Sequence, residues 1–238
     1  MIDTDTKIQR RTFDSLGHAN HGWLDARHHF SFASYHDPDR MGWGAIRVWN
    51  DDTIQPQNGF PPHPHCDMEI ITYVRTGAIT HQDSMGNKGR TGAGDVQVMS
   101  AGSGVRHAEY NLEDETTTLF QIWIEPRTSG GSPSWGAKPF PKADRSGRFV
   151  TLASGFAEDT DALPIRAEAR VLAATLQAGE TLTHPVGAGR HAYLVPATGR
   201  ITIDGQPFEA RDGAALSGGQ TVTIAAQEDA EIVLVDSE

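Results

Sequence analysis

Two short histidine motifs hold the residues of this chain best suited to chemistry. His63-Pro64-His65 carries two imidazoles at positions i and i+2, and His107-Ala108-Glu109 repeats the spacing with an imidazole and a carboxylate. In an extended strand such side chains emerge on one face, as two ligands of one ion must. Two such pairs on facing strands supply three nitrogens and one oxygen, which suit Fe, Cu, Ni, Mn or Zn. The motifs predict a metal site made by His63, His65, His107 and Glu109.

The other histidines point less clearly to a metal. Nine of the 11 histidines stand at or before position 107, and five of these lie in the segment 18–36. His28 and His29 are adjacent, so on a strand they face opposite sides and cannot both reach one ion. We expect the aromatic residues of this segment to pack against the β-structure: Trp23, Phe30, Phe32 and Tyr35.

Short strands joined by tight turns are the expected framework for these motifs. The chain of 238 residues contains 25 Gly and 13 Pro, and few segments follow the 3.6-residue period of a helix. Strands are predicted at 45–49, 68–74, 78–82, 96–99 and 119–124, and again at 170–176, 191–195, 200–203, 222–224 and 231–235. This pattern is typical of an all-β sandwich or barrel.

Two stretches of the sequence recur in the same order. TGAIT at 76–80 returns as TGRIT at 198–202, an offset of 122, and DVQVMSAG at 95–102 resembles DGAALSGG at 212–219. A segment rich in Gly, Pro and Ser, 128–147, separates the copies and has the composition of a connector. We therefore predict a metal-binding domain over 1–127, a linker over 128–147 and a second copy over 148–238.

The repeat also tests whether the second copy holds a metal. The offset of 122 places Pro185 and Gly187 at the positions of the first histidine pair. Aligning the later glycines places Ile224 and Ala226 opposite His107 and Glu109. None of these four is a side-chain ligand, so one ion per chain is expected.

Composition excludes several classes of partner. The 20 Lys and Arg against 31 Asp and Glu give a net charge of −11, which argues against direct binding of nucleic acid or of a membrane surface. The single Cys66 excludes an intrachain disulfide, as fits a reducing compartment. The start of the chain lacks an apolar core of signal-peptide length, and no apolar run of 18 residues occurs. A cytoplasmic protein is expected.

Long ordered stretches of this chain resemble the pirin family of the cupin superfamily. HPHCDMEIITYVRTGAITHQDSMGN (63–87) and GAGDVQVMSAGSGVRHAEYN (92–111) resemble its metal motif, and GWLDARHHFSFASYHDP (22–38) resembles its opening. The likeness is close over 10–125 and holds in outline over 135–238, as in short bacterial pirins of the quercetinase type. It implies an all-β bicupin, with two cupin-type β-barrel or sandwich domains and a degenerate C-terminal copy.

The family's ligands fall on His63, His65, His107 and Glu109. Many other cupins take their carboxylate from the first motif, where Glu69 stands here, but the resemblance to pirins favours Glu109 as the ligand. Glu69 is then a candidate to support the site, or an ordinary ion-paired or hydrogen-bonded residue. Cys66 stands where relatives commonly carry Arg; strand alternation points it away from the ligands, and we predict a buried, small apolar residue.

The resemblance also implies a cofactor and a reaction. One divalent transition metal per chain is expected, with Fe(II) favoured and Cu, Ni, Mn and Zn as alternatives. Several pirins show quercetin 2,3-dioxygenase activity, in which O2 opens the central ring of a flavonol and carbon monoxide is released. Glu109 is the expected general base for the flavonol 3-hydroxyl, and Phe60 and Tyr73 are candidates for an apolar wall. The expected partners are a polyphenol and O2, and a monomer is expected.

Other functions fit the same residues. Some pirins are iron-dependent transcriptional coregulators, in which the oxidation state of the metal alters a protein-binding surface without turnover. A metal-dependent sugar-phosphate isomerase would need Lys and Arg around the ion, and only Arg106 stands near the motifs. A purely structural metal is the remaining alternative.

Overall fold

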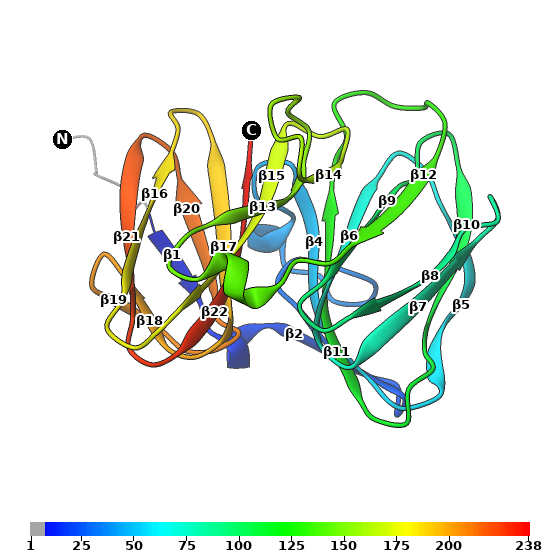
Figure 1. Ribbon diagram of the computed structural model, residues 1–238, viewed down its shortest axis with the longest axis horizontal. Coiled ribbons are helices and arrows are strands. Elements are labelled where there is room, and N and C mark those ends of the chain that lie inside the picture. The colour runs from blue at the N-terminus through cyan, green and yellow to red at the C-terminus, as the bar shows by residue number, and fades with distance from the viewer. Residues whose placement is uncertain (1–7) are drawn as a thin grey trace.

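The computed structural model describes residues 8–238, so the first seven residues of the predicted N-terminal domain lie outside it. Within the described residues the regular elements are strands and three short 3-10 helices (Figure 1). The strands up to the connector are β1 (Ile8–Arg11), β2 (Gly17–Asn20), β3 (Leu24–His28), β4 (Ile46–Ile54), β5 (Asn58–His65), β6 (Glu69–Thr76), β7 (Ala78–Asp83), β8 (Lys88–Gly92), β9 (Val96–Ser100), β10 (Val105–Asn111) and β11 (Thr117–Ile124).

The second half continues in the same style. Its strands are β12 (Ser134–Lys138), β13 (Val150–Ser154), β14 (Leu163–Pro164), β15 (Ala169–Leu176), β16 (Thr181–Val186), β17 (His191–Thr198), β18 (Ile201–Ile203), β19 (Gln206–Phe208), β20 (Gly213–Ser217), β21 (Gln220–Ala226) and β22 (Ala230–Ser237). The 3-10 helices are η1 (Phe13–Ser15), η2 (Pro38–Arg40) and η3 (Lys142–Arg145). All ten strands predicted from the sequence are present.

The strands form four sheets. One seven-stranded sheet has the order β12-β9-β6-β11-β4-β3-β2 and packs with the four-stranded sheet β5-β10-β7-β8. The other seven-stranded sheet, β1-β20-β17-β22-β15-β13-β14, packs with β16-β21-β18-β19. The small sheets repeat one order, and the shared part of the large sheets does too, so the predicted duplication of an all-β domain is confirmed. The domains are sandwiches rather than closed barrels.

Strand alternation builds a shared core between the two large sheets. Ile71 and Tyr73 of β6 pack in one cluster with Val171 of β15 and Val233 of β22, and all four are fully buried. Thr72, between the first two, points the other way, into the first sandwich. Because the large sheets bury their apolar faces against each other, the order of layers is small, large, large, small (Figure 1).

In each large sheet, one edge strand comes from a part of the chain outside the repeated domain that forms the rest of the sheet. β1, at the start of the described chain, pairs with β20 of the second domain, from Ile8 opposite Leu216 to Arg11 opposite Gly213. β12, inside the predicted linker, pairs with β9 through five residues. The segment 128–147 is therefore folded onto the first domain for part of its length. The boundaries at 127 and 147 stay a prediction.

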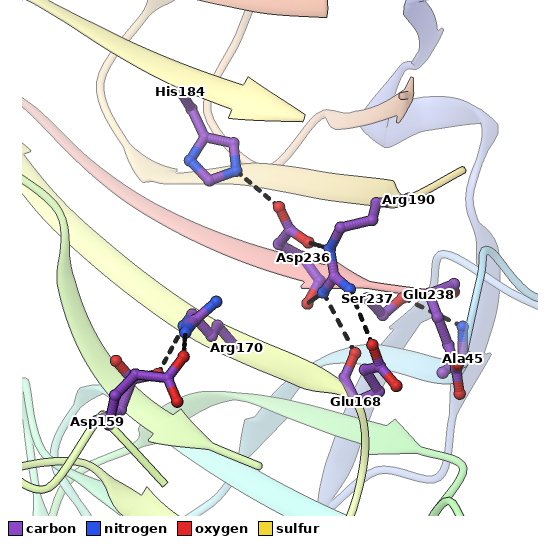
Figure 2. A network of polar contacts seen from close by, with 10 residues as sticks. Ala45, Asp159, Glu168, Arg170, His184, Arg190, Asp236, Ser237 and Glu238 are labelled. Atoms are coloured by element: carbon purple, nitrogen blue, oxygen red, sulfur yellow. Dashed lines mark hydrogen bonds and ion pairs between the residues drawn. The ribbon is translucent and has the colours of Figure 1, made fainter. Parts of the chain in front are cut away.

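The last strand, β22, also ties the two domains together. The backbone N–H of Ala45 donates to Ser237 Oγ and to the carbonyl of Glu238, each at 3.1 Å. Next to this contact, Asp236 accepts from Arg190 Nε at 2.5 Å and lies 3.1 Å from His184 Nε2 (Figure 2). These contacts fix the C-terminal strand in its sheet and against β4. No helix in residues 8–238 is long and apolar enough to cross a membrane.

Candidate metal centre

The structure brings three of the predicted ligands together. His63 and His65 lie near the end of β5, and His107 lies on β10 directly opposite His63. One ring nitrogen from each of the three lies within 4.8 Å of the other two. His107 Nε2 is 3.1 Å from His63 Nε2. Two nitrogens that each lie about 2.1 Å from one ion at a right angle are about 3 Å apart, so this spacing suits a shared cation.

The hydrogen bonding of these rings also fits a cation. His65 Nε2 is buried and has no hydrogen-bond partner in the structure, although such an atom normally finds one. His63 Nδ1 lies 2.8 Å from the carbonyl oxygen of Pro61, which can only accept a proton. His63 therefore carries its proton on Nδ1 and keeps the lone pair of Nε2 for the centre.

Electrostatics keep two of the rings, those of His65 and His107, uncharged, as metal ligands must be. Burial, with the neighbouring His63 and His81, lowers the pKa of His107 to about 3. Burial, with His107 and His63, lowers the pKa of His65 to about 4, although Glu109 opposes this shift. Both imidazoles are thus neutral at neutral pH before any ion binds.

Acid is expected to destabilise the metal-free protein because of these two pKa values. An unfolded histidine titrates near pH 6.5, whereas the folded rings resist protonation until about pH 4 or 3. Their contribution is fully present above about pH 6.5 and falls as the pH drops, by up to about 1.4 kcal/mol per pH unit for each proton. Thermal unfolding of chelator-treated protein between pH 8 and 5 measures the effect. A His107→Phe variant should show a shallower slope; equal slopes would contradict the assignment.

Glu109 is as buried as His107, whereas His63 and His65 are half-buried. Its carboxylate forms a second group with His81 and His107, whose ligand atoms all lie within 4.8 Å of one another. Glu109 is opposite His81 on β7, while an irregularity in the pairing of β10 with β5 shifts it opposite Phe60. His107 is thus common to both groups, and three histidines with Glu109 make a candidate metal site. Their assignment as the ligand set stays a prediction.

Side chains from three other strands hold the Glu109 carboxylate. Gln97 Nε2 donates to Oε1 and Gln121 Nε2 donates to Oε2, each at 2.7 Å. The Thr72 hydroxyl also donates to Oε1, at 3.1 Å. Trp123 Nε1 donates to Gln121 Oε1 at 3.2 Å and thereby turns that amide's NH2 toward Glu109. Both carboxylate oxygens are therefore oriented before a substrate or ion arrives.

Two neighbours of the centre, His81 and Asp83, were not predicted from the sequence. His81 is fully buried and its Nε2 lies 3.1 Å from Asp83 Oδ2. Burial opposes ionisation of Asp83, but hydrogen bonds led by those of Asn87 and His81 hold its pKa below the usual value. The signal for this pair was present, because His81-Gln82-Asp83 has the same i, i+2 spacing as the two motifs that were used.

Glu69 takes the second of its two predicted roles, that of a hydrogen-bonded residue, whereas Cys66 differs from its prediction. Glu69 points to the opposite face of β6 from Thr72, where Ser100 Oγ donates to its Oε2 at 2.5 Å. Burial raises the pKa of Glu69, against these hydrogen bonds. The prediction that Cys66 is buried is wrong: it is exposed, because β5 ends at His65 and the chain turns through Asp67 at a φ of 47°.

Aromatic side chains border the centre on one side. The ring of Trp123 stands edge-on to His65 at 4.9 Å, and Phe32 contacts Trp123 at 5.5 Å. Phe60 lies 6.3 Å from His63. Tyr73 is not part of this wall, because it is buried between the domains and bonded to Glu231. Beside the ends of β5 and β10 a hollow of about 430 Å³ reaches His65.

In the second domain the equivalent positions differ from those that the sequence offset predicts. Strand pairing places Leu182 opposite Ile224 and His184 opposite Val222, as His63 and His65 lie opposite His107 and Val105. Pro185 and Gly187 are therefore not the equivalents of the histidine pair, because the stretch from His184 to the start of β17 is three residues longer than the stretch from His65 to the start of β6. His184 bonds to Asp236, and its sandwich is filled by aliphatic residues such as Leu194 and Leu216.

Comparison with known proteins agrees with this architecture. The Pirin family model matches residues 9–124, and the model of the quercetinase C-terminal cupin domain matches residues 151–237. A pirin-like protein of Caulobacter vibrioides is 70% identical over 230 residues, which cover 97% of this chain and 99% of that protein. A quercetin 2,3-dioxygenase of Escherichia coli is 41% identical over 96% of this chain and 98% of its own length.

A solved structure gives the same result. A bacterial pirin from Escherichia coli, crystallised in complex with nickel(II), superposes with a TM-score of 0.91 at 41% identity, covering 97% of this chain and 98% of that one. Both sandwiches are thus cupin domains, and the resemblance noted in the sequence extends over both. The chain belongs to the pirin family.

Proposed function

We propose that this protein is a metal-dependent dioxygenase that opens the central ring of a flavonol such as quercetin with O2 and releases carbon monoxide. The observation that carries the proposal is the convergence of His63, His65 and His107. His65 Nε2 has no hydrogen-bond partner there, and the nearby Glu109 carboxylate is held by hydrogen bonds. Relatives named quercetin 2,3-dioxygenase and a relative crystallised with nickel(II) support it.

The proposed ligands are His63, His65, His107 and Glu109, holding one divalent ion, for which Fe(II), Ni(II), Cu, Mn and Zn are the candidates. When bound, the ion supplies a Lewis acid and open positions for O2 chemistry. Glu109 accepts the proton of the flavonol 3-hydroxyl. The donors from Gln97 and Gln121 hold its carboxylate in one orientation before the substrate enters. Trp123 and Phe32 provide an apolar border beside His65.

Metal analysis and turnover on one preparation test the proposal. We expect one equivalent of a transition metal per chain, together with aerobic consumption of quercetin and release of carbon monoxide. Removal of the ion by a chelator should abolish consumption, and adding the same metal should restore it. A fully loaded protein that leaves quercetin intact would refute the dioxygenase and favour the alternative, a redox-sensing pirin that regulates through protein contacts.

Replacing Glu109 by glutamine should lower the turnover rate more than the metal content. A positioned general base contributes about 10²- to 10⁴-fold to rate, and the amide cannot take its proton. Glu69→Gln is the matched control, because it neutralises another buried carboxylate on the opposite face of β6. The control should retain turnover. An equal loss of metal and rate in Glu109→Gln would make Glu109 a ligand only.

A further inference from the structure

A chain of hydrogen bonds links Asp83 to the candidate metal centre. His81 Nε2 lies 3.1 Å from Asp83 Oδ2, and His81 Nδ1 lies 3.4 Å from His107 Nδ1. The other nitrogen of His107, Nε2, lies 3.1 Å from His63 Nε2. Because His81 is fully buried and His107 nearly so, the contact between these two rings is shielded from water.

Asp83 sets the direction of the protons along this chain. Its carboxylate accepts from the backbone N–H groups of Met85 and Asn87 and from the Asn87 side chain, at 2.9 to 3.0 Å. An ionised carboxylate only accepts, so His81 must carry its proton on Nε2 and present a bare Nδ1. His107 then donates its Nδ1 proton to His81, which leaves the lone pair on His107 Nε2.

We propose that His81 and Asp83 are positioning residues that fix the tautomer of His107, so that the lone pair of its Nε2 is directed at the metal. A carboxylate behind a ligating imidazole also makes that imidazole a stronger ligand. His63 is held in the same tautomer, with its proton on Nδ1, by a hydrogen bond to the backbone carbonyl of Pro61. The inference rests on the metal site of the proposed function but not on its reaction.

Two observations assign His81 to positioning rather than to ligation. The ring of His107 presents its two nitrogens to different partners, Nε2 to His63 and Nδ1 to His81, so a single ion cannot take both. The indole of Trp135 also lies flat against the His81 ring, with centroids 4.8 Å apart and planes at 9°, and holds it in place.

Nitrogen NMR of the metal-free protein near neutral pH tests the inference directly. Two-bond ¹H–¹⁵N spectra distinguish Nδ1–H from Nε2–H, and we expect Nε2–H for His81 and Nδ1–H for His107. Addition of Zn²⁺ should shift His107 Nε2 and leave His81 Nδ1 unbound. Asp83→Asn should mix the tautomers and weaken Zn²⁺ binding about 10- to 100-fold, measured by competition with a chromophoric chelator.

Two variants at position 81 separate positioning from packing. His81→Asn keeps an acceptor near the place of Nδ1 and should retain most of the Zn²⁺ affinity. His81→Phe keeps a ring against Trp135 but removes the acceptor, and should lose as much affinity as Asp83→Asn. Asp236→Asn is the matched control, because it breaks the His184–Asp236 pair, which has the same 3.1 Å separation, in the other domain (Figure 2).

Several outcomes would overturn the inference. These are a proton on Nε2 of His107 in the unaltered protein, coordination of Zn²⁺ by His81, and equal affinities of His81→Phe and His81→Asn. An affinity loss in Asp236→Asn as large as that in Asp83→Asn would also overturn it, since the effect would then be one of general stability. Expected tautomers with no flavonol cleavage would count against the proposed function alone.

Discussion

Replacing His107 by alanine is expected to strip the metal and abolish flavonol cleavage while the protein stays folded. His107 lies between His63 and His81. Its loss removes one proposed ligand and leaves only His63 and His65, both on β5, as histidine ligands. Changes to residues that merely support a ligand typically cost 10- to 100-fold in affinity, and the loss of a ligand should exceed about 100-fold. Metal content by elemental analysis and quercetin consumption measure the two effects.

The fold should survive because its cores do not depend on the ion. The cluster between the large sheets and the aliphatic filling of the second sandwich lie away from the three histidines. Circular dichroism should therefore be unchanged, with a modest decrease in melting temperature from the cavity. His18→Ala is the control, since this histidine of β2 is exposed and pairs with Asp25, which is exposed too. A His107→Ala protein with full metal content would show that the centre is assigned wrongly.

The second large expected effect is a loss of stability when the cluster of polar contacts around Glu231, between the two domains, is broken. Glu231 of β22 accepts from Arg145 Nη2 at 2.9 Å and from Lys142 Nζ at 2.6 Å, and also from the Tyr73 hydroxyl of the first domain. Arg145 is only 1% exposed. Glu231→Ala would leave this guanidinium buried without its anion, which typically costs about 3–5 kcal/mol. Urea unfolding should show a loss of that size in the free energy of unfolding.

A neighbouring ion pair provides the matched control. Glu228 and Arg200 are joined at 3.5 Å, but their side chains are 49% and 55% exposed. Exposed pairs contribute about 0–1 kcal/mol, so Glu228→Ala should be nearly neutral. Glu231→Gln keeps hydrogen-bond acceptors for Arg145 and should fall between the two. If Glu231→Ala were no more destabilising than Glu228→Ala, the contacts of Glu231 would not stabilise the interface between the domains.

The all-β class, the duplication and the shared face of His63 and His65 were predictable from patterns along the chain. Alternation of side chains along a strand is set by the backbone, so His63 and His65 share a face in any strand that holds them. The sequences of β6 and β11 are rich in apolar residues between turns, and both strands are buried over most of their length. Such signals need no knowledge of which strand lies beside which.

Only the tertiary structure decided which of the remaining polar residues join the centre. Glu69 and Glu109 are both buried carboxylates near the motifs, but the sheet sends Glu69 to Ser100 and places Glu109 among Gln97 and Gln121. The position of His81 behind His107 depends on the pairing of β7 with β10, and the shift of register in the second domain depends on a loop length. Sequence spacing determines the face of a strand on which a side chain lies, whereas contacts across strands depend on pairing and register, which local sequence does not encode.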